Sequence, residues 1–167
     1  LNKFLRKIGD APVIYNEADA IRSQEEIAKA VQNLGYMGAT VKRTIKTKKK
    51  KLKLFYEINS GRPYTVRTLK YDISDKKIAE YLQNDSTKST LKEGMLFDVN
   101  TLDTERQRIT DYLLCNGYYK FNKDYITYTA DTARNTYQVD LTLHLLPYKA
   151  YVGDVPKEHP QYKINKI

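Results

Sequence analysis

The chain has 167 residues, of which 41% are hydrophobic and 29% are charged. This composition excludes a disordered protein, and the length fits one ordinary domain or two small ones. No apolar run in the sequence approaches the roughly 18 residues that a membrane-spanning helix needs. Fifteen tyrosines and four phenylalanines favour a strand-rich fold, because aromatic side chains suit a pleated, half-buried surface.

The net charge of +9 indicates an acidic partner, and nucleic acid, an anionic lipid surface and acidic protein segments all fit this requirement. Eight of the 29 lysines and arginines lie between Lys42 and Lys53. We interpret this run as the solvated tip of a hairpin, where lysines protect a sheet edge from aggregation. An anionic lipid surface is the alternative contact for the same run.

Residues that could support catalysis or metal binding are scattered. Cys115 is the single cysteine, and His144 and His159 have no metal-ligand spacing around them. No glycine-rich phosphate loop is present. Three acids close together in the sequence are interpreted as a helix start, where they complement the helix dipole: Asp98, Asp103 and Glu105. We therefore expect no enzymatic activity, no cofactor and no metal site.

An internal repeat is the most informative feature of the sequence. Aligning Gly35-Tyr36 with Gly117-Tyr118 gives an offset of about 82 residues and places Ile27 on Ile109. Each copy has the pattern of a helix, a glycine and two alternating strands. The glycine is expected to end the helix in a left-handed conformation, and the tyrosine after it is expected to fold back onto the helix.

In the first copy the spacing predicts a helix from Glu17 to Leu34. Its buried stripe is expected to contain four residues: Ile27, Ala30, Val31 and Leu34. The alternating segments ATVKRTIK and KLKLFYEIN then predict a hairpin.

The second copy is preceded by further elements. YTVRTLKYDI predicts a strand with Val66 and Thr68 on one face and Leu69, Tyr71 and Ile73 on the other. A short helix is expected over residues 76–83, with two apolar residues facing inward, Ile78 and Leu82.

A second helix follows, capped by Asp98 or Asn100, and its expected stripe contains Leu102, Arg106, Ile109 and Leu113. The segments DYITYTAD and YQVDLTLHLL predict a second hairpin.

The order strand–helix–helix–strand–strand predicts an α+β fold, with a three-stranded mixed sheet packed against two helices. Residues 62–147 are expected to form one complete unit. Residues 1–61 are expected to form the rear part of another unit, without its opening strand and first helix, and residues 148–167 a linker and the start of a third. Because the sequence begins at Leu1 without a leader, we expect it to be part of a longer array.

This unit, repeated in tandem, resembles the POTRA domain, and the resemblance is carried by ten residues of the second copy: Glu93, Gly94, Phe97, Asp98, Leu102, Arg106, Ile109, Gly117, Tyr118 and Tyr119. FLRKIGDAPVIY and FNKDYITY look most like BamA/TamA-type proteins of Bacteroidetes. The resemblance implies a parent protein with a signal sequence, a periplasmic POTRA array and a C-terminal outer-membrane β-barrel. It implies, as partners, unfolded outer-membrane proteins and accessory assembly proteins.

A three-stranded open sheet has two edges whose main-chain groups can pair with an incoming extended chain. By resemblance, the last strand lies in the middle and the strand after the second helix at an edge. The expected partner-binding residues are therefore Thr40, Val41, Lys42, Arg43, Thr44 and Ile45 in the first copy, and Tyr125, Ile126, Thr127, Tyr128 and Thr129 in the second. The opening strand, residues 65–69, is expected to be the other edge.

Two other functions remain open. The units could be a rigid spacer or docking arm that positions other domains without binding clients. A basic, tyrosine-rich surface could also bind nucleic acid by stacking, but the tyrosines alternate at core spacing and no nucleic-acid signature is present. We therefore expect a protein partner and no nucleic acid.

Overall fold

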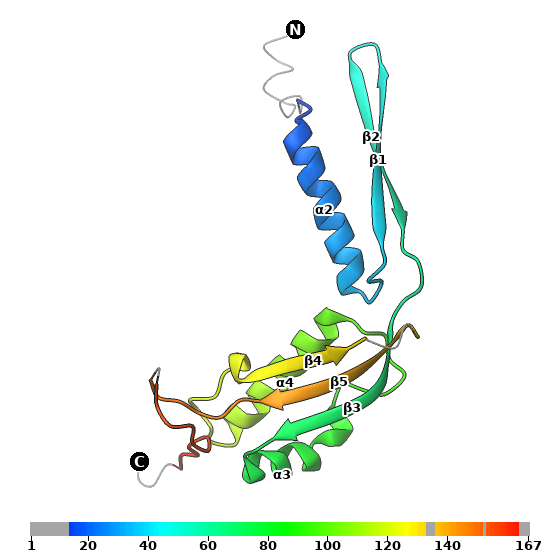
Figure 1. Ribbon diagram of the computed structural model, residues 1–167. Helices are drawn as coiled ribbons and strands as arrows, with labels where there is room; N and C mark the ends of the chain where they lie inside the picture. Colours follow the sequence, from blue (N-terminus) through cyan, green and yellow to red (C-terminus); the bar gives the residue numbers. More distant parts are fainter. Residues whose placement is uncertain (1–13, 133–135, 152, 164–167) are drawn as a thin grey trace.

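The structure is a computed structural model that describes residues 14–132, 136–151 and 153–163. Its elements form two groups (Figure 1). The first contains helix α2 (Glu17–Asn33) and the hairpin of β1 (Thr40–Lys48) and β2 (Lys51–Asn59). The second begins at β3 (Thr65–Ile73), and the chain between the groups is short and extended.

The second group has the predicted order of elements. After β3 come α3 (Lys76–Asn84), α4 (Val99–Cys115), β4 (Ile126–Asp131) and β5 (Gln138–Leu145), with short 3-10 turns at Ser86–Lys88 and Lys123–Tyr125. The sheet order is β3-β5-β4, in which β5 pairs parallel with β3 and antiparallel with β4. The predicted α+β fold, with a mixed three-stranded sheet and two helices, is therefore confirmed, and β5 occupies the middle.

The core of this group lies between the sheet and the two helices. From β5, the side chains of Val139, Leu141 and Leu143 are completely buried. From α3, Ile78 and Leu82 are buried as predicted. Burial of this many apolar side chains, at about 1.5–3 kcal/mol each, is what holds the two layers together.

Strand β3 departs from the predicted alternation. A bulge between Val66 and Thr68 interrupts its register with β5. Val66 is buried, and Leu69 also packs against the core, so the prediction that these two residues lie on opposite faces was wrong. The additional residue in the bulge shifts the later side chains to the other face. It also lets Arg67 and Thr68 both bind the carboxylate of Asp140, the threonine hydroxyl at 2.8 Å.

Both long helices end in the same hydrogen-bonded motif. Gly35 and Gly117 have φ angles of +94° and +88°, which L side chains rarely adopt. In each helix the glycine N–H and the following tyrosine N–H donate to two carbonyl groups of the last turn, the pattern of a Schellman motif. The pairs are Gly35 to Gln32 (2.9 Å), Tyr36 to Val31 (3.4 Å), Gly117 to Leu114 (3.1 Å) and Tyr118 to Leu113 (3.0 Å).

The buried stripe predicted for α2 was partly wrong. Ala30 is exposed and Leu34 is 45% exposed, and in this helix only Ala20 is buried. The hairpin beside α2 is similarly open, because Leu52 and Ile58 of β2 are 37% and 50% exposed. Among the described residues, one helix and one hairpin form this group, too few elements to enclose a core.

No helix within the described parts of the chain is both long enough and apolar enough to cross a membrane.

We expect Tyr118→Ala to lower the free energy of unfolding by about 3 kcal/mol or more, as for other large aromatic truncations in a core. The Tyr118 ring is 1% exposed and lies edge-on to Tyr81 at 5.9 Å. Tyr118→Phe is the matched control, since it keeps the ring and the hydroxyl makes no hydrogen bond to a described residue. Urea unfolding checks both variants, and equal losses of stability would contradict the packing role.

Candidate functional site

The first half of the outer edge of β3 is covered by the chain itself. The Val66 N–H donates to the carbonyl of Met95 (2.8 Å), and the Gly94 N–H donates to the carbonyl of Val66 (2.7 Å). Farther along, the Leu69 N–H donates to a carboxylate oxygen of Glu93 (3.2 Å). The loop before α4 thus covers residues 65–69, which the sequence predicted to be the other edge of the sheet.

The outer edge of β4 is different. The Leu146 N–H donates to the carbonyl of Tyr125 (2.7 Å), and this bond sets the alternation of the antiparallel ladder. Thr127 and Thr129 therefore direct their main-chain groups toward β5, whereas Tyr128 and Ala130 direct theirs outward. Within residues 14–132, 136–151 and 153–163, no main-chain hydrogen bond engages these outward groups.

Side chains of β4 anchor this edge to the core. Ile126 is fully buried, and the hydroxyl of Tyr128 donates to the carbonyl of Leu102 in α4 (3.2 Å). Burial strongly raises the pKa of the Tyr128 hydroxyl, so it remains a neutral donor. The predicted segment from Tyr125 to Thr129 lies at the sheet edge except for Tyr125, which ends the 3-10 turn before the strand.

The second predicted segment, from Thr40 to Ile45, lies in β1 and pairs with β2 throughout. Helix α2 contacts it. The Gln24 side chain donates to the carbonyl of Val41 (2.8 Å), and Arg43 forms an ion pair with Glu17. These contacts hold the helix against the hairpin and engage part of the main chain that an incoming strand would use.

The lysine run forms the tip of this hairpin, as predicted. Lys48 and Lys51 face each other across the turn, and Lys49 adopts a φ angle of +56°. Six exposed lysines gather here: Lys46, Lys48, Lys49, Lys50, Lys51 and Lys53. The tip is at the opposite end of the hairpin from the second sheet (Figure 1).

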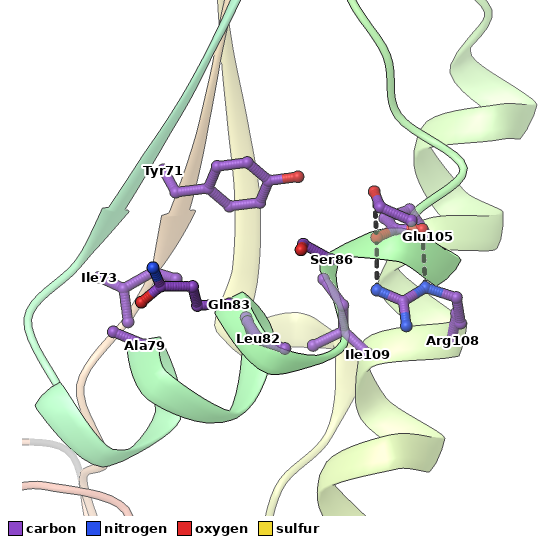
Figure 2. Close-up of a pocket in the computed structure, with 10 residues that line it drawn as sticks. Tyr71, Ile73, Ala79, Leu82, Gln83, Ser86, Glu105, Arg108 and Ile109 are labelled. Carbon is purple, nitrogen blue, oxygen red and sulfur yellow. Dashed lines mark hydrogen bonds and ion pairs between the residues drawn. The ribbon is translucent and has the colours of Figure 1, made fainter.

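A cavity of about 290 Å³ lies between β3, α3 and α4. Figure 2 shows Tyr71 and Ile73 from the strand, Leu82 from α3 and Ile109 from α4 around it, with Glu105 and Arg108 at one side. The walls are largely apolar. Glu105 is the buried carboxylate among the lining residues. Acid–base chemistry in this cavity would require that its carboxylate be free to exchange a proton.

Glu105 is 1% exposed and every side of its carboxylate is bonded. It accepts hydrogen bonds from the Ser89 hydroxyl (2.9 Å) and from both the N–H and the hydroxyl of Thr90 (2.9 Å each). Arg108 holds it with two nitrogens, at 2.7 and 2.9 Å, and also pairs with Asp85. The carboxylate has no lone pair directed at the cavity, so it stabilises the structure and is unsuited to proton transfer.

Sequence reasoning misassigned this residue. Glu105 was interpreted as part of the helix start, and Arg106 was placed on the buried stripe. In the structure Asp98 alone caps α4, while Glu105 lies farther into the helix and faces the core. Arg106 is only partly buried, and its guanidinium donates to the Lys123 carbonyl (2.9 Å). The sequence did contain a signal for the role of Glu105, because Glu105 and Arg108 lie one helical turn apart and can form an ion pair.

Burial by itself would raise the pKa of Glu105, but the hydrogen bonds from Arg108, Ser89 and Thr90 outweigh it, and the pKa is lowered from 4.5. A carboxylate with a depressed folded-state pKa contributes stability above its unfolded pKa and loses that contribution as the pH falls through the folded value.

We therefore expect Glu105→Gln to destabilise the protein by about 3 kcal/mol at neutral pH, because the neutral amide loses the ion pair with Arg108 and turns an NH2 group toward the donors of Ser89 and Thr90. The loss should shrink as the pH falls below 4.5. Urea unfolding at several pH values measures both effects, and Glu25→Gln at an exposed position of α2 is the control. A pH-independent loss would contradict the assignment.

No family model and no curated protein matches the sequence. Among solved structures, the chain is similar to BamA from Haemophilus ducreyi lacking POTRA domains 1–3, with a TM-score of 0.46, 17% identity, and coverage of 81% of this chain and 24% of that chain. It is similar to Haemophilus influenzae BamA POTRA3-5, with a TM-score of 0.41, 16% identity, and coverage of 86% and 53%.

The chain is also similar to the N-terminal domain of Omp85 from Thermosynechococcus elongatus, with a TM-score of 0.38, 13% identity, and coverage of 86% and 57%. It spans less than two thirds of the length of each of these structures.

Proposed function

We propose that this chain belongs to the periplasmic POTRA array of an outer-membrane assembly protein and captures extended polypeptide segments at the open edge of β4. The captured segments are nascent outer-membrane proteins or accessory subunits. The observation that carries the proposal is the difference between the two sheet edges. The chain covers the edge of β3 with its own loop at residues 65–69, whereas the main-chain groups of Tyr128 and Ala130 point outward.

The energetics of this edge suit a carrier that must release its client. A strand of six residues presents outward groups from every second residue, here Ile126, Tyr128 and Ala130. About four new hydrogen bonds at about 1 kcal/mol each give about 4 kcal/mol, which corresponds to a millimolar dissociation constant. Main-chain pairing also tolerates many client sequences.

The proposal includes the domain organisation expected from the sequence. Residues 62–147 are a complete unit, 1–61 the rear part of a preceding unit, and 148–167 the linker and start of a following one. The openness of the first group supports this division. Its strand β2 corresponds to β5, yet Ile58 is 50% exposed whereas Leu141 and Leu143 of β5 are completely buried. An opening strand and helix would cover this face.

We expect Ala130→Pro to weaken binding of extended peptides, with sequences taken from the strands of outer-membrane barrels, at least tenfold. Proline removes the outward N–H and is tolerated at a sheet edge. Thr127→Ala is the matched control, because it changes an exposed side chain of the same strand and leaves the main chain intact. Chemical-shift titration of labelled protein with millimolar peptide measures both.

Shifts confined to residues 126–131, lost in Ala130→Pro and retained in Thr127→Ala, would support capture at β4. The absence of shifts in the unmodified chain at millimolar peptide would contradict the proposal and favour a rigid spacer or docking arm. Equal weakening by the two variants would also contradict a main-chain mechanism.

The lysine tip is a candidate for a second contact, with an anionic lipid surface. The observation in its favour is the concentration of six exposed lysines at one end of the hairpin. Each lysine close to an anionic membrane contributes about 1 kcal/mol, and salt screens the attraction.

We expect the double variant Lys49→Glu with Lys50→Glu to lose most of its cosedimentation with phosphatidylglycerol vesicles at low salt. The control carries the same charge change on α3, at the exposed Lys76 and Lys77. Equal loss in both variants would show that only net charge matters and would contradict a specific role for the tip.

A further inference from the structure

The two groups of elements are joined by direct contact at the end of α2. The carbonyl of Gly35 accepts the N–H of Tyr64 (2.8 Å), the residue before β3. Gly35 is buried, and a Cβ added to it would lie 2.7 Å from the carbonyl oxygen of Phe97. Only glycine permits this approach, so the loop before α4 lies against the helix-ending glycine of the preceding group.

Main-chain pairing within the second group places that loop. The Phe97 N–H donates to the carbonyl of Tyr64 (2.9 Å), and Leu96 forms a bridge with Thr65. Met37, two residues after Gly35, packs against the core of the second group. The junction therefore has three parts. The Gly35 carbonyl accepts a hydrogen bond from the residue before β3, the loop at Phe97 lies beside this glycine, and the Met37 side chain packs against the core of the second group.

The first part of this junction recurs after the second group. The carbonyl of Gly117 accepts the N–H of Tyr162 at the same distance, 2.8 Å. A Cβ added to Gly117 would lie 2.5 Å from the carbonyl oxygen of Tyr162. The preceding residue is also held, because the Gln161 amide donates to the carbonyl of Asn116 (2.9 Å) and to the Tyr81 hydroxyl (3.1 Å).

His159 fixes the same segment farther back. Its side chain is 6% exposed, its N–H donates to Asp75 (3.0 Å), and its Nε2 lies 2.9 Å from the carbonyl of Leu146. Asp75 is also the N-cap of α3. The segment from His159 to Tyr162 is thus held on the second group, as Tyr64 is held on the first group.

The position that corresponds to Met37 is Tyr119, two residues after Gly117. Met37 is partly buried against a following core, whereas Tyr119 is 58% exposed. Its ring lies 4.3 Å from that of Tyr162, and the Lys120 ammonium lies within 6 Å of both rings. An aromatic pair exposed at this position has the composition of an interface core.

We propose that Gly117, Tyr119 and Tyr162 form the docking surface for a further unit of the same β-α-α-β-β fold. The opening strand of that unit begins at Tyr162, as β3 begins after Tyr64. Its loop before the second helix pairs with Tyr162 as Phe97 pairs with Tyr64, and Tyr119 packs against its core. This inference rests on the proposed division of the chain into units, and it does not depend on peptide capture at β4.

The first experiment tests the hydrogen bond from Tyr162 to Gly117. We expect Gly117→Ala to speed exchange of the Tyr162 amide hydrogen at least tenfold. Gly94→Ala is the matched control, since Gly94 has a similar φ of +84° but nothing within 4 Å of an added Cβ. Retained protection in Gly117→Ala, or loss of protection in both variants, would overturn the assignment.

The second experiment adds a further copy of the unit, which should bind the proposed docking surface. Residues 1–163 are followed directly by residues 66–167, so that Val66 follows Lys163 as it follows Thr65 in the native sequence. Tyr119→Phe in the appended copy leaves one Tyr119 to probe. We expect nitration of this tyrosine to slow about tenfold relative to the 167-residue chain, while nitration of the exposed Tyr151 of the first copy is unchanged.

Undiminished nitration of Tyr119 would overturn the proposal even if the appended copy folds. The proposal would also be overturned if the sheet amide hydrogens of the appended copy showed no protection from exchange. In the proposal the opening strand of that copy begins at Tyr162, so its sheet should form. The variant Gly117→Ala within the concatenated chain should restore the reactivity of Tyr119.

Discussion

A sheet of three strands presents two outer rows of main-chain N–H and C=O groups, and each row must find water, another part of the chain or a partner. In this protein the two rows are treated differently. The row along β3 is occupied between Val66 and Leu69 by Gly94, Met95 and the Glu93 carboxylate. The row along β4 faces outward, and the buried side chain of Ile126 and the Tyr128 hydroxyl hold that strand in place. This difference is the reason why we propose strand addition at the edge of β4.

The loop that closes β3 depends in turn on the buried ion pair. Glu105 accepts three hydrogen bonds from Ser89 and Thr90, which lie immediately before this loop, and Arg108 balances its charge. The network links the loop to α4 and ties the chain after α3 to the core. Glu105 and Arg108 beside the cavity thus stabilise the fold. The Glu105 carboxylate, which borders the cavity, already accepts hydrogen bonds from Ser89, Thr90 and Arg108.

The glycines that end the two long helices also contact a segment that is distant along the chain. A left-handed glycine ends the helix, and its small size then lets another stretch of main chain approach its carbonyl. Gly35 and Gly117 make the same hydrogen bond, to Tyr64 and Tyr162. One residue type at one position thereby ends a helix and holds the start of the next segment.

The sequence by itself determined the elements and their order, because hydrophobic periodicity, caps and glycine stops are local properties. The repeat, the hairpins, a helix cap at Asp98 or Asn100 and the α+β fold were all predictable for this reason. The resemblance to POTRA domains followed from the same residues.

Only the tertiary structure decided which predicted faces are covered. Ala30 and Leu34 satisfy a helical apolar pattern but remain exposed, because burial depends on elements that are distant along the chain. The bulge at Arg67 moved Leu69 to the core face, and the closure of the β3 edge by Glu93 joins residues 24 positions apart. Periodicity describes a face of one element, whereas burial and edge closure are properties of pairs of elements, and those pairs exist only in the folded chain.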